Sequence, residues 1–214
     1  MRSPRGLFFI LALVALSATS ALVTSSASAQ FESEAETTRL TISSNSMQKF
    51  APTSGASRIE CTTVTVPSSF VVGKPTTAVS VGAKYSGCEP FLGASPVNVF
   101  MNSCIYVFHL AKGSTTGTVD IECPENAKIE IEIGKICEYQ IGTQTGLSSV
   151  SFKNTGSGTT REVIVEPNVS GITSTLTTND FFCPAAGSTG TYTGAATVTG
   201  ENNAGTAHIG IFVD

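Results

Sequence analysis

The sequence predicts an all-β protein, an antiparallel β-sandwich of about ten or more short strands with turn signals at the spacing typical of such folds. Three observations support this fold class. Apolar and polar residues alternate in short runs, Ser, Thr, Val, Ile and Gly dominate the chain, and no window after Gln30 shows apolar residues at helical spacing. Alternation of this kind favours strands that have one buried face.

The first residues predict export. Two arginines open the chain, Leu7–Leu16 is apolar, and a stretch of small residues ends in an Ala-x-Ala site at residues 27–29. This pattern is typical of a secretory signal peptide, so we expect residues 1–29 to be removed and the protein to be secreted outside the cell. The apolar run is shorter than the roughly 20 residues of a membrane-spanning helix, so no membrane span is expected. Residues 30–214 then form a single β-sandwich domain.

The charge of the chain limits its partners. The formal net charge is −4, and charged residues make up 13% of the sequence. Nucleic acids and anionic membranes are bound by basic patches, so neither is an expected partner. A ligand outside the cell or on its surface is the remaining class. The glycine-rich stretches at 113–117 and 156–158 lack the Lys-Ser/Thr and the helix of a phosphate site, so they are read as turns and no cofactor is expected.

Six cysteines are present, an even number. In an exported chain this predicts three disulfides, whereas a metal site would need closer cysteine pairs or more than two histidines. The six are Cys61, Cys88, Cys104, Cys123, Cys137 and Cys183.

The first half of the mature chain is divided by turn residues. An acidic and loose lead-in is expected over residues 30–36. Strands are expected next, with turns or loops at 54–57, 67–75, 86–88 and 90–96. The expected strands are 37–42, 58–66, 78–85 and 97–101.

The stretch 104–141 is read as a β-meander. Its first hairpin pairs 104–110 with 117–123, with Leu110 opposite Gly117. In this register one face is almost wholly apolar, and a slip by one residue would bury charges. Cys104 then lies directly opposite Cys123, close enough for a disulfide. The other four cysteines allow three pairings, of which Cys61–Cys88 with Cys137–Cys183 is favoured.

The remaining strands follow similar patterns. Lys128–Ile133 alternates strictly, with isoleucines on one face and glutamates on the other. Turn residues at 167–171 predict a hairpin between the strands that flank them. The expected strands after the central alternation are 136–141, 147–152, 161–166, 172–176, 191–199 and 206–213.

Several short motifs occur along the mature chain. They are Phe31 with Ser33-Glu34, Tyr85-Ser86-Gly87-Cys88, Cys104-x-Tyr-x-Phe-His-Leu, Ile121-Glu122-Cys123-Pro124, Asn154-Thr155-Gly156-Ser157-Gly158, and Thr189 to Gly194 before Val198-x-Gly200. Together these motifs resemble a group of exported actinobacterial proteins of unknown function. The similarity spans nearly the whole mature chain, and it implies an exported, cysteine-paired β domain without assigning any catalytic or binding residue.

An acidic cluster gives one candidate site. If the strands 118–123 and 128–133 pair, Asp120 must lie near Glu130 or Glu132, and like charges directly opposite each other are destabilising. A bound Ca²⁺ would relieve that repulsion, with Asp120, Glu122, Glu130 and Glu132 as ligands. The favoured alternative is a solvated outer face without metal, because the loop motif of strong calcium sites is absent.

The histidines give a second candidate. His109 and His208 are the only two, and each lies at an outward position of an expected strand. No motif of a nucleophilic or metal-dependent hydrolase surrounds them, so a surface role is favoured. We therefore expect a secreted or surface-associated protein with a non-enzymatic binding or structural role. The alternative is a small extracellular hydrolase that uses carboxylates, His109 or His208.

Overall fold

The computed structural model describes residues 30–55, 58–67, 70–72, 75–90, 95–178, 181 and 183–214. The expected signal peptide, residues 1–29, lies outside this described part, as does most of the expected loop at 90–96.

The protein is all-β and its sheets are antiparallel, which confirms the predicted fold class. One 3-10 turn, η1 (Gly158–Thr160), is the helical element of the described residues, and none of them forms a helix long and apolar enough to cross a membrane. The strands are β1 (Phe31–Ser33), β2 (Thr37–Ser44), β3 (Gln48–Ala51), β4 (Ile59–Thr65), β5 (Phe70–Val72), β6 (Ala78–Val81), β7 (Lys84–Glu89), β8 (Val97–Phe100), β9 (Ile105–Leu110), β10 (Thr116–Glu122), β11 (Ile129–Ile133), β12 (Cys137–Ile141), β13 (Gln144–Thr155), β14 (Glu162–Ile172), β15 (Thr175–Leu176), β16 (Gly190–Thr193), β17 (Ala196–Glu201), β18 (His208–Ile209) and β19 (Ile211–Val213).

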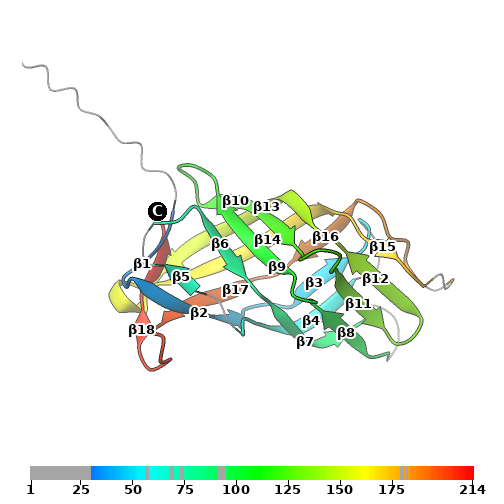
Figure 1. Ribbon diagram of the computed structural model, residues 1–214, viewed down its shortest axis with the longest axis horizontal. Helices are drawn as coiled ribbons and strands as arrows, with labels where there is room; N and C mark the ends of the chain where they lie inside the picture. The colour runs from blue at the N-terminus through cyan, green and yellow to red at the C-terminus, as the bar shows by residue number, and fades with distance from the viewer. Residues whose placement is uncertain are drawn as a thin grey trace, which may run out of the picture.

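The largest sheet divides at β14. Strands β6, β9, β10, β13 and β14 are neighbours in this order, and β14 then pairs with two different strands along its length. Its first half pairs with β17, which leads to β2 and β5, and its second half pairs with β16, which leads to β3, β4 and β7. Figure 1 shows β13 and β14 running along the long axis of the molecule. The two branches diverge from β14, so their inner faces can enclose a core.

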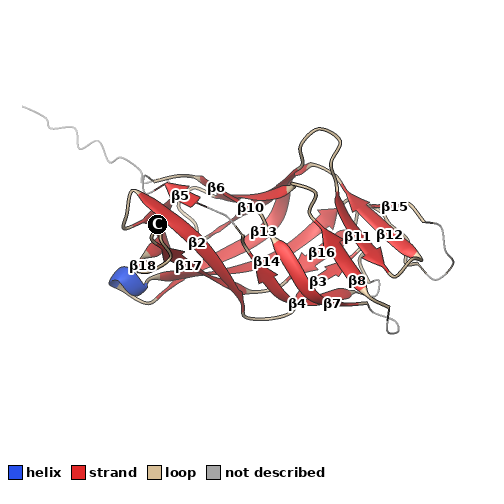
Figure 2. Cartoon of the chain, turned by 60° about the horizontal axis from the view of Figure 1, so that its bottom comes forward, coloured by secondary structure: helices blue, strands red, loops and turns tan. Residues whose placement is uncertain are grey.

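Two smaller sheets lie at opposite ends of the molecule. The sheet β15-β12-β11-β8 lies at one end, and the pair β1-β19 lies at the other, beside the C-terminus (Figures 1 and 2). The short ladder between β1 and β19 places Phe31 opposite Val213, and both side chains are buried. The expected loose lead-in at 30–36 therefore contains a strand, because its one aromatic residue packs into the core.

The central hairpin has the predicted register. Gly117 lies opposite Leu110, and Ile121 lies opposite Tyr106. A side chain at Gly117 would clash with the backbone carbonyl of His109, so the absence of a Cβ allows the two strands to approach closely at this point. The disulfide Cys104–Cys123 closes the other end of the hairpin.

The disulfides Cys61–Cys88 and Cys137–Cys183 are also formed, so the favoured pairing of all six cysteines is confirmed. Cys61 and Cys88 lie directly opposite each other in the ladder of β4 and β7.

The predicted meander is wrong at its middle, between residues 123 and 129. Strands β10 and β11 do not pair: β10 pairs with β13 in the large sheet, while β11 pairs with β12 and β8 in the end sheet. Residues Pro124 to Lys128 therefore connect two sheets rather than two neighbouring strands. The strict alternation of β11 nevertheless predicted its buried face correctly. Ile129, Ile131 and Ile133 are all buried, with exposed fractions of 2%, 4% and 3%.

The hairpin expected around residues 167–171 is also wrong. β14 continues from Glu162 to Ile172 as one strand. Pro167 lies between the residues that pair with β17 and those that pair with β16, where the ladder on that side is interrupted. Gly171 has a φ of +81° at a shift in register between Ser170 and Ile172. The turn-forming residues thus mark a change of partner and a bulge, not a reversal of the chain.

Three smaller expectations also differ from the structure. The expected turn at 86–88 is part of β7, and the expected loop at 67–75 contains β5. The expected pair 191–199 with 206–213 is only partly present: β17 pairs with β18 over two residue pairs, whereas β19 pairs with β1.

Candidate functional site

A cavity lies among the inner faces of the strands. Its volume is about 170 Å³, and residues from both branches of the large sheet, from the end sheet and from β19 line it. The lining is mostly aliphatic and aromatic; Leu40, Phe50, Val119, Phe152 and Val198 are examples. Glu32 is the charged residue among the described residues that line it. A cavity with such walls can hold an apolar molecule.

A polar group interrupts this apolar lining. Tyr85 on β7, Tyr106 on β9, Tyr192 on β16 and Gln48 on β3 all border the cavity, and we call these four residues the tyrosine cluster. The Tyr85 hydroxyl oxygen lies 3.1 Å from that of Tyr106 and 3.2 Å from that of Tyr192. The Tyr192 hydroxyl in turn donates to Oε1 of Gln48 at 2.6 Å. The ring of Tyr85 packs edge-on against that of Tyr192, with 6.3 Å between centroids.

Gln48 fixes one end of the cluster. Its side chain is buried, with 3% exposure, and its Nε2 donates to the carbonyl oxygens of Ser46 at 3.0 Å and Ala195 at 3.1 Å. Both amide protons are therefore used, which identifies Oε1 as the atom that faces Tyr192. A side chain at Gly194 would clash with the Gln48 amide, so the glycine leaves room for it.

The hydroxyls of the cluster are held in their neutral form. Burial, followed by repulsion from the neighbouring tyrosine, raises the pKa of Tyr85, Tyr106 and Tyr192 above the ordinary value. All three side chains retain some accessible surface, and all three border the cavity. The cluster is thus an uncharged set of hydrogen-bonding groups at the cavity wall.

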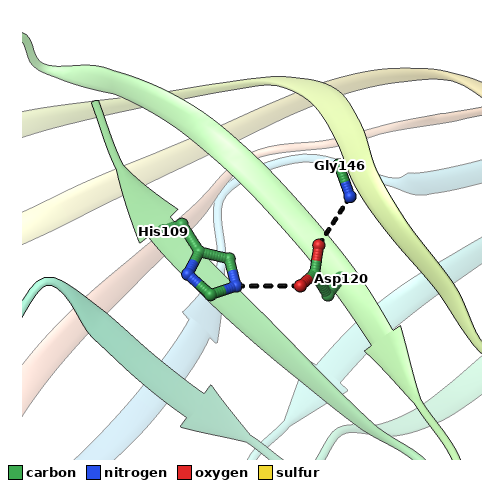
Figure 3. A network of polar contacts seen from close by, with 3 residues as sticks. All are labelled: His109, Asp120 and Gly146. Atoms are coloured by element: carbon green, nitrogen blue, oxygen red, sulfur yellow. Dashed lines mark hydrogen bonds and ion pairs between the residues drawn. The ribbon is translucent and has the colours of Figure 1, made fainter.

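The two histidines lie apart from this cavity. His109 on β9 contacts Asp120 on β10, with 3.0 Å between Nε2 and Oδ2 (Figure 3). The other carboxylate oxygen of Asp120 accepts the backbone N–H of Gly146 on β13 at 2.6 Å. Asp120 lies at a shift in register between β10 and β13, so this contact provides an acceptor for an N–H at the interrupted ladder.

No serine, threonine or cysteine side chain in the described residues hydrogen-bonds to His109, and His208 on β18 is exposed. For the alternative of a hydrolase, a histidine and a carboxylate are in contact, but among the described residues no hydroxyl or thiol is hydrogen-bonded to that histidine.

The acidic residues are not brought together. Asp120 and Glu122 lie on β10, whereas Glu130 and Glu132 lie on β11 in the end sheet, so the pairing that suggested a Ca²⁺ site does not occur. Within the described residues, no group of three or more His, Cys, Asp or Glu side chains could hold a metal ion.

The like charges of the end sheet are moderated by amides. Glu132 lies directly opposite Glu138. Gln140 donates to Glu138 Oε1 at 3.0 Å, and Asn102 donates to Glu130 Oε2 at 3.0 Å. Glu130 and Glu138 thus each accept a hydrogen bond from a neutral amide.

The tyrosine cluster was not predicted from the sequence. Tyr106 falls on the apolar face of the predicted hairpin, which is the one signal that its hydroxyl lies inside the protein. Nothing local indicates that Tyr85, Tyr192 and Gln48 converge on it. Of the four strands that carry these residues, only β3 and β16 are neighbours in the sheet, and they are far apart in the sequence. Comparison of the chain with protein-family models, with curated proteins and with solved structures finds no match.

Proposed function

We propose that this chain is an exported, non-enzymatic binding protein that holds a small, uncharged, mainly apolar molecule in the cavity among its strands. The observation that carries the proposal is the cavity itself, about 170 Å³ in volume and lined by apolar side chains around one polar cluster. Ligand sites have this character: apolar walls with a few polar groups that fix orientation.

The cavity has an energetic cost. Residual cavities destabilise proteins by about 24 cal/mol per Å³, so a cavity of about 170 Å³ corresponds to about 4 kcal/mol. Protein interiors are otherwise close-packed, with few voids larger than a water molecule. A ligand that fills the space would recover much of this free energy, which supports a binding role.

The walls favour a neutral ligand over an anion. Moving a charge from water into such a site is unfavourable unless an opposite charge meets it. No lysine, arginine or histidine is among the described residues that line the cavity, so an anion would have no partner there.

The disulfides support the exported location. Three of them, Cys61–Cys88, Cys104–Cys123 and Cys137–Cys183, include all six cysteines. Such bonds persist in oxidising compartments. Together with the signal-peptide pattern of residues 1–29, they are the basis for placing the function outside the cell or on its surface.

Thermal unfolding with small probes tests this function. Benzene and toluene are the neutral probes, and benzoate is the charged control. At a free concentration of about one hundred times Kd, binding adds about 2.7 kcal/mol to the free energy of unfolding. We expect the neutral probes to raise Tm by about 5–11 °C in a protein of this size, and benzoate to leave it unchanged.

A cavity-filling variant makes the test specific. Ala196 is buried and lines the cavity, so Ala196→Leu should occupy part of it and reduce the response to toluene. Ala83→Leu does the same from another segment, and Ala111→Leu makes the same change at an exposed site, as a control. The proposal fails if no neutral probe stabilises the parent protein, or if both filled variants respond as fully as the control.

A further inference from the structure

The hydroxyl protons of the tyrosine cluster can be assigned from its contacts. Gln48 Oε1 must receive a proton, and the Tyr192 hydroxyl is the donor that faces it. The Tyr192 oxygen is then free to accept from Tyr85, and the Tyr85 oxygen is free to accept from Tyr106. In this order, Tyr106 to Tyr85 to Tyr192 to Gln48, every short contact is a hydrogen bond and every proton is used.

The reverse order at Tyr106 satisfies fewer contacts. If Tyr85 donated to Tyr106, the Tyr106 proton would face the Met101 sulfur at 4.0 Å, a weak acceptor. The contact of 3.2 Å between Tyr85 and Tyr192 would then have no proton. In both orders the protons stay within the protein, so the cluster presents unused oxygen lone pairs to the cavity.

We propose that the cavity selects a neutral molecule about as large as one aromatic ring that carries a hydrogen-bond donor, and that this donor binds the hydroxyl oxygen of Tyr106. This inference rests on the proposed function. The size follows from the cavity of about 170 Å³, since an apolar cavity of about 150 Å³ accommodates benzene. The need for a donor on the ligand follows from the order of the protons. Tyr106 is the first donor in the series of hydrogen bonds, so its oxygen accepts no proton from another member of the tyrosine cluster.

Phenol, toluene and anisole separate the possible modes of recognition. Phenol and toluene have similar shapes, but only phenol can donate a proton, whereas anisole can only accept one. A ligand that only accepts would have to divert the Tyr106 proton from Tyr85, which would break one bond of the chain. We expect the intact, disulfide-bonded protein to favour phenol.

Two variants test the roles of individual oxygens, with affinities measured by calorimetric titration. Tyr106→Phe removes the acceptor, so the preference for phenol over toluene should fall about fivefold, the factor for one neutral hydrogen bond. Tyr85→Phe leaves the Tyr106 proton without its oxygen partner, so binding of anisole relative to toluene should rise by about the same factor.

Tyr139→Phe is the matched control. The Tyr139 hydroxyl donates to the Pro184 carbonyl at 2.8 Å, and Tyr139 is not among the residues that line the cavity. Loss of this hydroxyl should leave the affinity ratios of phenol to toluene and of anisole to toluene unchanged. Because each ratio is compared between variants, differences in hydration among the probes cancel.

The outcomes separate this inference from the proposed function. Suppose that toluene binds the parent protein and all three variants, but the ratio of phenol affinity to toluene affinity is the same in Tyr106→Phe and the parent. The assignment of the ligand's donor to Tyr106 is then wrong, while the binding function stands. If none of the three probes binds the parent protein, both are overturned.

Discussion

Raising the pH above about 10 should unfold this protein in one cooperative step, because its cavity tyrosines can ionise freely only after unfolding. Burial raises the pKa of Tyr85, Tyr106 and Tyr192 in the folded state, whereas in the unfolded chain each is near its ordinary value. The folded state thus retains protons that the unfolded state releases. Their contribution to stability is complete below the unfolded pKa and is lost as the pH rises towards the folded pKa.

The size of the effect follows from the number of tyrosines. Each group reduces the free energy of unfolding by about 1.4 kcal/mol per pH unit between its two pKa values, so the three together reduce it by about 4 kcal/mol per unit. Tyr139, whose pKa burial raises to about 12, adds to this slope. A domain of ordinary stability, about 5–15 kcal/mol, would therefore unfold within about one to four units above pH 10.

The assay follows tyrosinate absorbance and far-ultraviolet circular dichroism in the same alkaline titration. The two signals should change together over a narrow pH range. Tyr85→Phe should reduce the contribution of the cluster to the slope by about a third, as measured by urea unfolding at several pH values. A gradual rise of tyrosinate absorbance near pH 10, with the dichroism unchanged, would refute the burial of these hydroxyls.

Two further predictions concern what holds the site in place. Gln48→Leu removes the three hydrogen bonds made by that side chain and should reduce the free energy of unfolding in urea by about 2–4 kcal/mol, so a loss below about 0.5 kcal/mol would contradict its anchoring role. The double variant Cys137→Ala/Cys183→Ala opens a loop with a sequence separation of 46 and should cost about 4 kcal/mol in the chain-entropy model; unchanged stability in the same assay would show that the bond does not constrain the unfolded chain.

The local sequence pattern was enough to predict the hairpin of β9 and β10 and the strand β11. In both, the two-residue period allows only one face to be buried. In the hairpin this fixes the register, and therefore the position of Cys104 opposite Cys123. At β14, by contrast, the local composition predicted a turn that is absent. Pro167 and Gly171 have the composition of a turn, but their position is explained by strands β16 and β17, which meet β14 from elsewhere in the chain.

The candidate site was harder to predict for a related reason. The inward orientation of Tyr106 follows from the alternation of its strand. Its contact with Tyr85 depends on how β7 and β9 are placed across the core, and they are far apart in the order of strands. The functional hypotheses drawn from the sequence concerned charged residues and histidines, whereas the polar side chains of the tyrosine cluster are neutral.

The most direct test of the account is a crystal structure of the intact protein soaked with phenol. We predict electron density for one ring inside the cavity, with the phenol oxygen at hydrogen-bonding distance from the Tyr106 hydroxyl. Density for phenol only on the outer surface, or an interior in which side chains fill the space beside the tyrosine cluster, would contradict it.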